Sequence, residues 1–87
     1  MMQITKHFTL EELTRSDTAV RFGIDNEPGS EETENLVRVC DMILEPIRHR
    51  YDTPILPSSG YRCLELNRKI GSSDKSQHTK GQAVDFE

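Results

Sequence analysis

The sequence predicts a small α+β domain, and three observations lead to this fold class. Residues 30 to 51 carry apolar side chains at steps of three and four, which is the spacing of an amphipathic helix. Residues 55 to 59 and 81 to 86 are short segments that favour an extended backbone. The chain has 87 residues, enough for one modest core. We therefore expect helices packed around a few short strands.

The N-terminal part is expected to contain one short helix. Thr9 and Glu12 have the spacing of a capping box, in which Thr9 caps the first free amides and Glu12 bonds back to Thr9. This helix is expected to end near residues 16–19. Residues 21–29 are rich in turn formers, among them Asn26. Residues up to 29 are thus expected to add a packing helix and a loop to the core.

The long helix is expected to supply the largest part of the core. Ser30 is predicted to cap its first amides. Pro46 lacks a backbone donor, so it is expected to kink the helix near Met42. The residues expected to face inward are Leu36, Cys40, Ile43, Ile47 and Tyr51, with Val37 and Leu44 widening the stripe.

The second half of the chain is expected to be an extended segment, a short helix and a polar loop. Pro57 places the extended segment at the edge of a sheet or at a bulge. The short helix is predicted over 63–70, with Gly71 as its C-cap. Its predicted inward residues are Leu64, Asn67 and Ile70.

Composition and charge exclude several classes of protein. The net charge is −4 and no basic face is evident, so binding to nucleic acid is not expected. No apolar run is long enough for a signal peptide or a membrane span, which predicts synthesis in the cytoplasm without Sec export. Two cysteines are too few for a disulfide framework, and Cys40 is expected to be a buried free thiol. We expect a monomeric single domain over 1–87, divided into 1–29 and a core over 30–87.

The candidate site lies near the end of the chain, where His78 and Asp85 flank a loop with Gly81. Glycine allows the tight reversal that would bring the imidazole to the carboxylate. A histidine nitrogen and an aspartate oxygen are donors that Zn²⁺ accepts, at about 2.0–2.2 Å. The spacing alone leaves two interpretations open, a metal site and an ordinary surface hydrogen bond. A catalytic zinc site also needs a third protein ligand.

Two motifs in this half resemble those of a known family. The first is Ser-x-His-x-x-Gly-x-Ala-x-Asp, filled by Ser76, His78, Gly81, Ala83 and Asp85. The second is Ser59-Gly60-Tyr61-Arg62, with Asn67 a few residues on. In this order and spacing they resemble the zinc D-Ala-D-Ala metallopeptidases, which include D-Ala-D-Ala carboxypeptidases and many phage endolysins. The resemblance covers roughly residues 31 to 87.

The resemblance implies a fold, a metal and a set of roles. The fold would be hedgehog-like, with helices on one face of a small antiparallel sheet and the metal site on the other. His78 and Asp85 would be the first two zinc ligands. Arg62 would lie near the scissile carbonyl and Ser76 would order the loop or contact substrate, although Arg62 also fits a cation at a helix start. The expected activity is hydrolysis of a peptidoglycan stem peptide ending in D-Ala, by zinc-activated water, at the bacterial cell wall.

The sequence departs from this family in one respect. The family's third ligand, a histidine, and its general base, a glutamate, lie together in a later segment, and Glu87 does not match that base. We therefore expect the N-terminal portion of a longer domain, which by itself binds zinc weakly if at all and does not hydrolyse peptides at a useful rate. Two alternatives stay open: a non-catalytic relative that binds a cell-wall peptide or a protein partner, and a small helical domain with a chance match.

Overall fold

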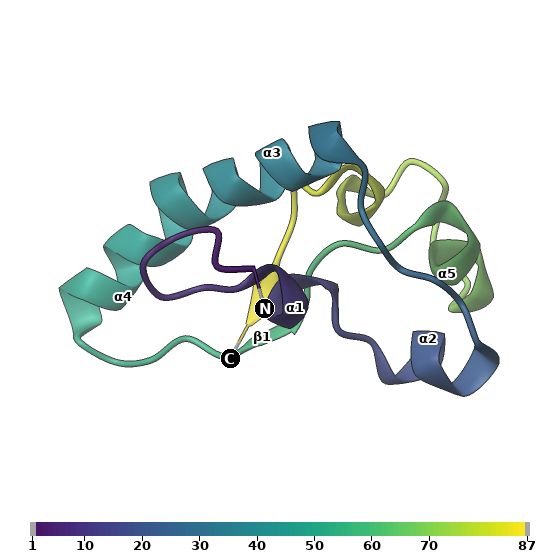
Figure 1. Ribbon diagram of the computed structural model, residues 1–87, viewed down its shortest axis with the longest axis horizontal. Coiled ribbons are helices and arrows are strands. Elements are labelled where there is room, and N and C mark those ends of the chain that lie inside the picture. Colours follow the sequence, from purple (N-terminus) through teal and green to yellow (C-terminus); the bar gives the residue numbers. More distant parts are fainter. Residues whose placement is uncertain (1, 87) are drawn as a thin grey trace.

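The computed structural model describes residues 2–86. They form four helices, when the consecutive segments α3, η1 and α4 are counted as one, together with a short 3₁₀ helix and a two-stranded antiparallel sheet (Figure 1). The third and longest helix runs across one side of the molecule and consists of three consecutive segments. The elements are α1 (Leu10–Thr14), α2 (Asp17–Phe22), α3 (Ser30–Val39), the π-helical segment η1 (Cys40–Leu44), α4 (Glu45–Tyr51), β1 (Pro57–Ser59), α5 (Leu64–Lys69), the short 3₁₀ helix η2 (Gln77–Lys80) and β2 (Asp85–Phe86). The α+β class is confirmed.

The capping box at the first helix is confirmed, but this helix is shorter than expected. The Glu12 amide donates to Thr9 Oγ1 at 3.3 Å, and the Thr9 amide donates to a Glu12 carboxylate oxygen at 3.0 Å. The helix ends at Thr14, and a separate helix α2 follows. The Ser16 hydroxyl accepts the Ala19 amide at 3.1 Å and so caps this second helix. A serine side chain competes in this way with the backbone bonds that would have continued the first helix.

The long helix contains its irregularity where Pro46 predicts one. Proline has no N–H to offer to the carbonyl of Met42 four residues earlier, and the backbone responds with the π-helical segment η1 directly before α4. The predicted capping role of Ser30 is wrong. The helix begins at Ser30 itself, after Gly29, and Gly29 has no side chain with which to cap it.

The π-helical segment also changes which side chains reach the core. Leu36, Cys40 and Leu44 are fully buried, whereas Ile43 is 51% exposed and Tyr51 is 66% exposed. A π turn holds more residues than an α turn, so the stripe shifts by one position across η1 and Leu44 takes the place predicted for Ile43. Two of the predicted inward residues, Ile43 and Tyr51, are therefore corrected to the surface.

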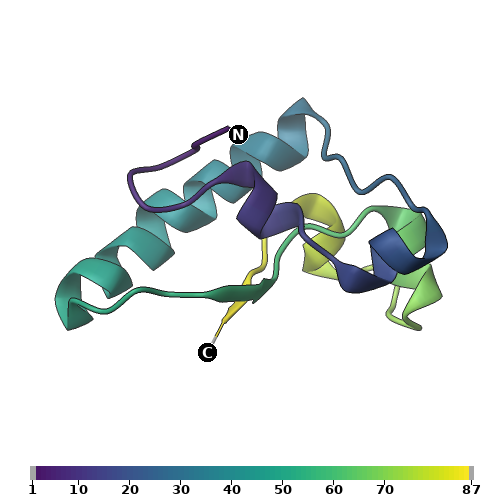
Figure 2. The ribbon, with the colours of Figure 1, turned by 60° about the horizontal axis from the view of Figure 1, so that its bottom comes forward.

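Most of the core lies between the long helix, α1 and the chain around β1 (Figure 2). Its buried members are Phe8, Leu13, Leu36, Cys40, Leu44, Ile55 and Tyr61. Cys40 is a free thiol, as predicted, and burial raises its pKa to about 12. A smaller cluster of Ala19, Ile24 and Leu66 joins α2 to α5. No helix among residues 2–86 has the length and apolar character needed to cross a membrane.

The prediction for the short helix α5 is confirmed for Asn67 and wrong for Leu64 and Ile70. Leu66 and Asn67 are fully buried, while Leu64 and Ile70 are exposed. The helix has fewer than two turns, and its contact with the smaller cluster comes from Leu66 in its middle, so the residues at its two ends point to solvent. Gly71 lies just beyond the helix with φ +81°, a conformation that suits glycine.

The sheet joins two segments that are distant in sequence. Pro57 pairs with Phe86 and Ser59 pairs with Asp85, in antiparallel register with an irregularity between the two pairs. Val84, directly before β2, packs against the main core. The sheet thus places Asp85 beside Ser59, next to the chain that leads to Arg62.

Candidate metal site

His78 is held in a defined orientation by its neighbours. It lies in η2, where the Ser76 hydroxyl accepts the His78 amide at 3.3 Å, and its side chain is only 12% exposed. Ring atom Nδ1 lies 2.6 Å from the carbonyl oxygen of Gly60. Because a carbonyl only accepts hydrogen bonds, Nδ1 must carry the proton. Whenever the ring is neutral, Nε2 is then the unprotonated nitrogen, the form in which histidine binds metals.

Asp85 meets this ring on the Nε2 side. Its Oδ2 lies 3.4 Å from Nε2, and its side chain is 67% exposed. In the neutral ring both atoms are acceptors, so neither can donate a hydrogen bond to the other. Two ligands at 2.0–2.2 Å from a tetrahedral zinc ion lie roughly 3.3 to 3.6 Å apart. The pair therefore has the atoms and the separation that a shared cation requires.

Two glycines allow the backbone segments of this site to pack closely. A Cβ on Gly60 would collide with the carbonyl oxygen of Leu13, and a Cβ on Gly81 would collide with that of Glu32. Gly81 also has φ +73°, which confirms the tight reversal after η2. Asn35 of α3 fixes the same turn by donating to the Lys80 carbonyl at 2.8 Å. The histidine loop is thus seated directly against the long helix.

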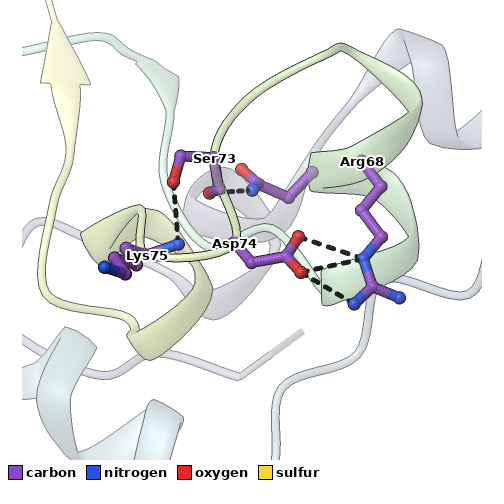
Figure 3. A network of polar contacts seen from close by, with 5 residues as sticks. Arg68, Ser73, Asp74 and Lys75 are labelled. Atoms are coloured by element: carbon purple, nitrogen blue, oxygen red, sulfur yellow. Dashed lines mark hydrogen bonds and ion pairs between the residues drawn. The ribbon is translucent and has the colours of Figure 1, made fainter.

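The polar loop before His78 is tied to α5 (Figure 3). The Arg68 guanidinium holds both oxygens of Asp74, with Nη2–Oδ2 at 2.8 Å. The hydrogen bonds between the two groups raise the pKa of Arg68 and lower the pKa of Asp74. The Lys75 amide donates to Ser73 Oγ at 3.1 Å. The buried Asn67 donates to the Ser73 carbonyl at 2.7 Å, which gives it a structural role. These bonds hold the loop that leads into η2 in a defined conformation.

Arg62 and Ser76 lie on the same side of the molecule as His78. The Arg62 amide donates to the His78 carbonyl at 3.1 Å, and its Nη2 is 3.5 Å from Ser76 Oγ. Its Nε is buried and has no hydrogen-bond partner among residues 2–86. The structure thus brings together all four residues singled out in the sequence, His78, Asp85, Arg62 and Ser76.

Sequence reasoning missed the role of Asn26, which was assigned only to a turn. Its Nδ2 donates to the carbonyls of Thr14 and Tyr61, and its Oδ1 accepts the Cys63 amide at 2.7 Å. One side chain thus joins the end of α1 to the chain on either side of Arg62. An asparagine among turn formers gives no sign of such distant partners.

A complete set of protein ligands does not occur among the described residues. Residues 2–86 contain no group of three or more His, Cys, Asp or Glu side chains that could hold a metal ion. His7, in the segment before α1, is hydrogen-bonded to Glu45 of the long helix. Glu87, which does not match the family's base, lies outside the described residues.

Comparison with known proteins tests the resemblance seen in the two motifs. None of the curated proteins compared with the chain matches it. The family model described as Peptidase M15 matches residues 6–87, nearly the whole chain, and so extends the resemblance into the N-terminal helices. The chain therefore belongs to the Peptidase M15 family, the zinc peptidase family of the D-Ala-D-Ala carboxypeptidases.

Proposed function

We propose that the function of this chain is zinc-dependent hydrolysis of peptidoglycan peptides, of the D-Ala-D-Ala carboxypeptidase or endolysin type. It would act as a monomer at the bacterial cell wall on a stem peptide ending in D-Ala. One observation carries the proposal. In a member of a zinc peptidase family, His78 turns Nε2 toward the Asp85 carboxylate at 3.4 Å, while the Gly60 carbonyl holds the other ring nitrogen.

The residues present fit zinc as two of its ligands. Imidazole nitrogen and carboxylate oxygen are the ligand types of catalytic zinc sites, and the bond from Nδ1 to a backbone carbonyl is the usual outer support of a metal-binding histidine. When bound, zinc supplies Lewis acidity and lowers the pKa of water toward about 7. His78 and Asp85 would hold the ion, with Asp85 reaching it from β2.

Arg62 would position the substrate. Within residues 2–86 its only side-chain hydrogen bond is the 3.5 Å contact from Nη2 to Ser76, so the terminal guanidinium nitrogens keep donors for a ligand, while Nε is buried. A charge-assisted hydrogen bond from this group to the peptide carbonyl would orient the carbonyl and stabilise negative charge that develops on its oxygen. Ser76 would hold both the loop and the arginine side chain in position.

No group of three metal-binding side chains occurs within residues 2–86, so a complete zinc site needs a third ligand besides His78 and Asp85. With two ligands the 87-residue chain should bind zinc only weakly, because the affinity of zinc sites grows with the number of preorganised ligands. The second candidate is a non-catalytic relative that binds a cell-wall peptide or a protein partner on this scaffold.

Isothermal titration of the 87-residue chain with zinc tests the ligand pair. We expect a dissociation constant of about 10 μM or weaker, lost in His78→Ala and in Asp85→Asn. His7→Ala is the matched control, because His7 also contacts a carboxylate but its Nδ1 is bonded to it directly at 2.6 Å. Nanomolar binding by the chain, or an equal loss in His7→Ala, would contradict the assignment.

Turnover separates the two candidate functions. A protein in which a third ligand completes the site should release D-Ala from a wall-derived peptide in the presence of zinc, and a chelator should abolish the release. A non-catalytic relative would bind the same peptide without releasing D-Ala. The Arg62→Lys variant should retain zinc but lose most of the rate, because lysine cannot reproduce the planar fork of donors.

A further inference from the structure

Asn26 pairs with the chain on both sides of Arg62, although it lies far from it in sequence. Its Nδ2 donates to the Tyr61 carbonyl at 3.0 Å, and its Oδ1 accepts the Cys63 amide at 2.7 Å. In an extended chain, the backbone groups of alternate residues point to the same edge, so one flat side-chain amide can pair with both. Asn26 thus takes the place of a neighbouring strand along this edge of the chain between β1 and α5.

The opposite edge of the same segment holds the candidate site. The Arg62 amide donates to the His78 carbonyl at 3.1 Å, and Nδ1 of the His78 ring lies 2.6 Å from the Gly60 carbonyl. Residues 60–63 therefore lie between two partners, Asn26 on one edge and the turn with His78 on the other. A displacement of this segment would move the Arg62 side chain and the carbonyl that orients the His78 ring together.

Asn26 is itself fixed from the N-terminal side. Its Nδ2 also donates to the carbonyl of Thr14, the last residue of α1, at 2.8 Å. Next to it, the Tyr61 amide donates to the Leu13 carbonyl at 2.7 Å. The bonds of Asn26 need two donors and one acceptor in a single plane, and among side chains of this size only asparagine has them. An aspartate of the same shape would offer no donor.

We infer that Asn26 is a positioning residue of the candidate site, which sets the orientation of Arg62 and of the His78 ring through the backbone of residues 60–63. The inference rests on the proposed function for what these two side chains do. A metal ligand or a catalytic group must be held to within about 0.5 Å of its place, so a residue that pairs with the chain on both sides of Arg62 affects the site as well as the fold. The loop before α3 then belongs to the machinery of the site, although it contributes no ligand.

Asn26→Asp tests the inference with almost no change in volume. The variant keeps the acceptor for the Cys63 amide, but it loses both donors and sets a negative charge against two carbonyls. Spectra of the ¹⁵N-labelled 87-residue chain are recorded at about pH 8, where an ordinary histidine is neutral. Long-range ¹H–¹⁵N correlations then show which ring nitrogen of His78 carries the proton.

We expect the proton on Nδ1 of His78 in the wild-type chain, because the Gly60 carbonyl accepts it. In Asn26→Asp this bond is weakened, and the ratio of the two tautomers should move toward Nε2–H by about threefold to tenfold. The Nε–H signal of Arg62, whose Nε is buried, should move toward the signals of the exposed arginines.

Ile47→Val in α4 is the matched control, because it removes one methylene at the edge of the main core. It should lower the midpoint of urea unfolding and leave the His78 tautomer and the Arg62 signal unchanged. The labelled spectrum of each variant reports whether it is folded. If Asn26→Asp does not fold, Asn26→Ser replaces it, since serine is neutral but too short to reach all three backbone groups.

Unchanged His78 and Arg62 signals in the Asn26 variant would overturn the inference, as would equal changes in Ile47→Val. A wild-type His78 that carries its proton on Nε2 would overturn it too. In a protein whose zinc site is complete, Asn26→Asp should lower kcat/KM about tenfold or more. If the spectra change as expected but no D-Ala is released by the wild-type site, the positioning role stands and the catalytic proposal fails. If D-Ala is released and neither spectra nor rate respond to Asn26→Asp, the reverse holds.

Discussion

Two regions of the molecule place a histidine beside a carboxylate, and they do so in opposite ways. In the segment before α1, His7 Nδ1 lies 2.6 Å from one oxygen of Glu45, and the His7 amide donates to the other oxygen at 2.8 Å. At the candidate site, Nδ1 of His78 is bonded to the Gly60 carbonyl instead, and Nε2 faces Asp85 at 3.4 Å. The first carboxylate is held by two hydrogen bonds of His7, whereas the second faces the ring nitrogen that the Gly60 carbonyl leaves free.

This difference shows what distinguishes a structural pair from a candidate metal pair. Proximity of imidazole and carboxylate is common to both regions. What differs is the partner of the ring proton, because a histidine that donates to a backbone carbonyl keeps its other nitrogen available for a metal. The residues that decide the chemistry of His78 are thus Gly60 and the turn at Gly81, neither of which binds anything itself.

The largest expected effect comes from removing the support of the His78 loop. Gly81→Ala should destabilise the fold by about 3 kcal/mol or more, because its Cβ would meet the Glu32 carbonyl and its φ is +73°. Gly71→Ala is the matched control. Its φ is +81° with no atom within 4 Å of a Cβ, so it should cost only about 1 kcal/mol. Urea unfolding of both variants measures the difference, and equal losses would show that close packing on α3 is unimportant.

The sequence predicted the elements that depend on local chemistry. The capping box at Thr9, the buried Cys40, the turn at Gly81 and the disturbance before Pro46 follow from short-range rules, and the structure shows each of them. The meeting of His78 with Asp85 was also foreseeable, because both belong to one short stretch with a glycine between them.

Other features depend on contacts between distant segments and could not be read from the sequence. The buried stripe shifts by one position at η1, which places Leu44 inward and Ile43 outward. A proline predicts that the helix is disturbed, but not which form the disturbance takes. Gly60 accepts the His78 ring proton across 18 positions, and Asn26 bonds Tyr61 across 35. No periodicity or spacing rule connects residues so far apart.

An effect of intermediate size is expected at the pair of His7 and Glu45. Burial acts to raise the pKa of Glu45, but the nearby Thr5 hydroxyl and the donors of His7 outweigh it and lower the pKa below its ordinary 4.5. A lowered pKa in the folded state means that the ionised form stabilises the fold. This contribution is complete above pH 4.5 and is lost as the pH falls through the lower folded-state value.

Glu45→Gln should therefore reduce the free energy of unfolding by about 1 kcal/mol at neutral pH, because the amide cannot accept from both His7 donors. The loss should shrink on acidification, since the wild-type protein then loses the same contribution. Thermal unfolding of both proteins between neutral pH and pH 3 measures the two curves. A difference that stays constant over this range would mean that Glu45 is not ionised in the fold.

The smallest effect is expected at Asp85, and its sign is the sharper test of the comparison. In metal-free buffer, Asp85→Asn replaces an acceptor that faces Nε2 by an amide that can donate to the neutral ring. Because Asp85 is mostly exposed, stability should change by no more than about 0.5 kcal/mol, and in the direction of greater stability. Urea unfolding in the presence of a chelator measures the change. A loss as large as that of Glu45→Gln would mean that His78 is protonated and holds Asp85 as an ordinary ion pair, and the two regions would then use their histidines alike.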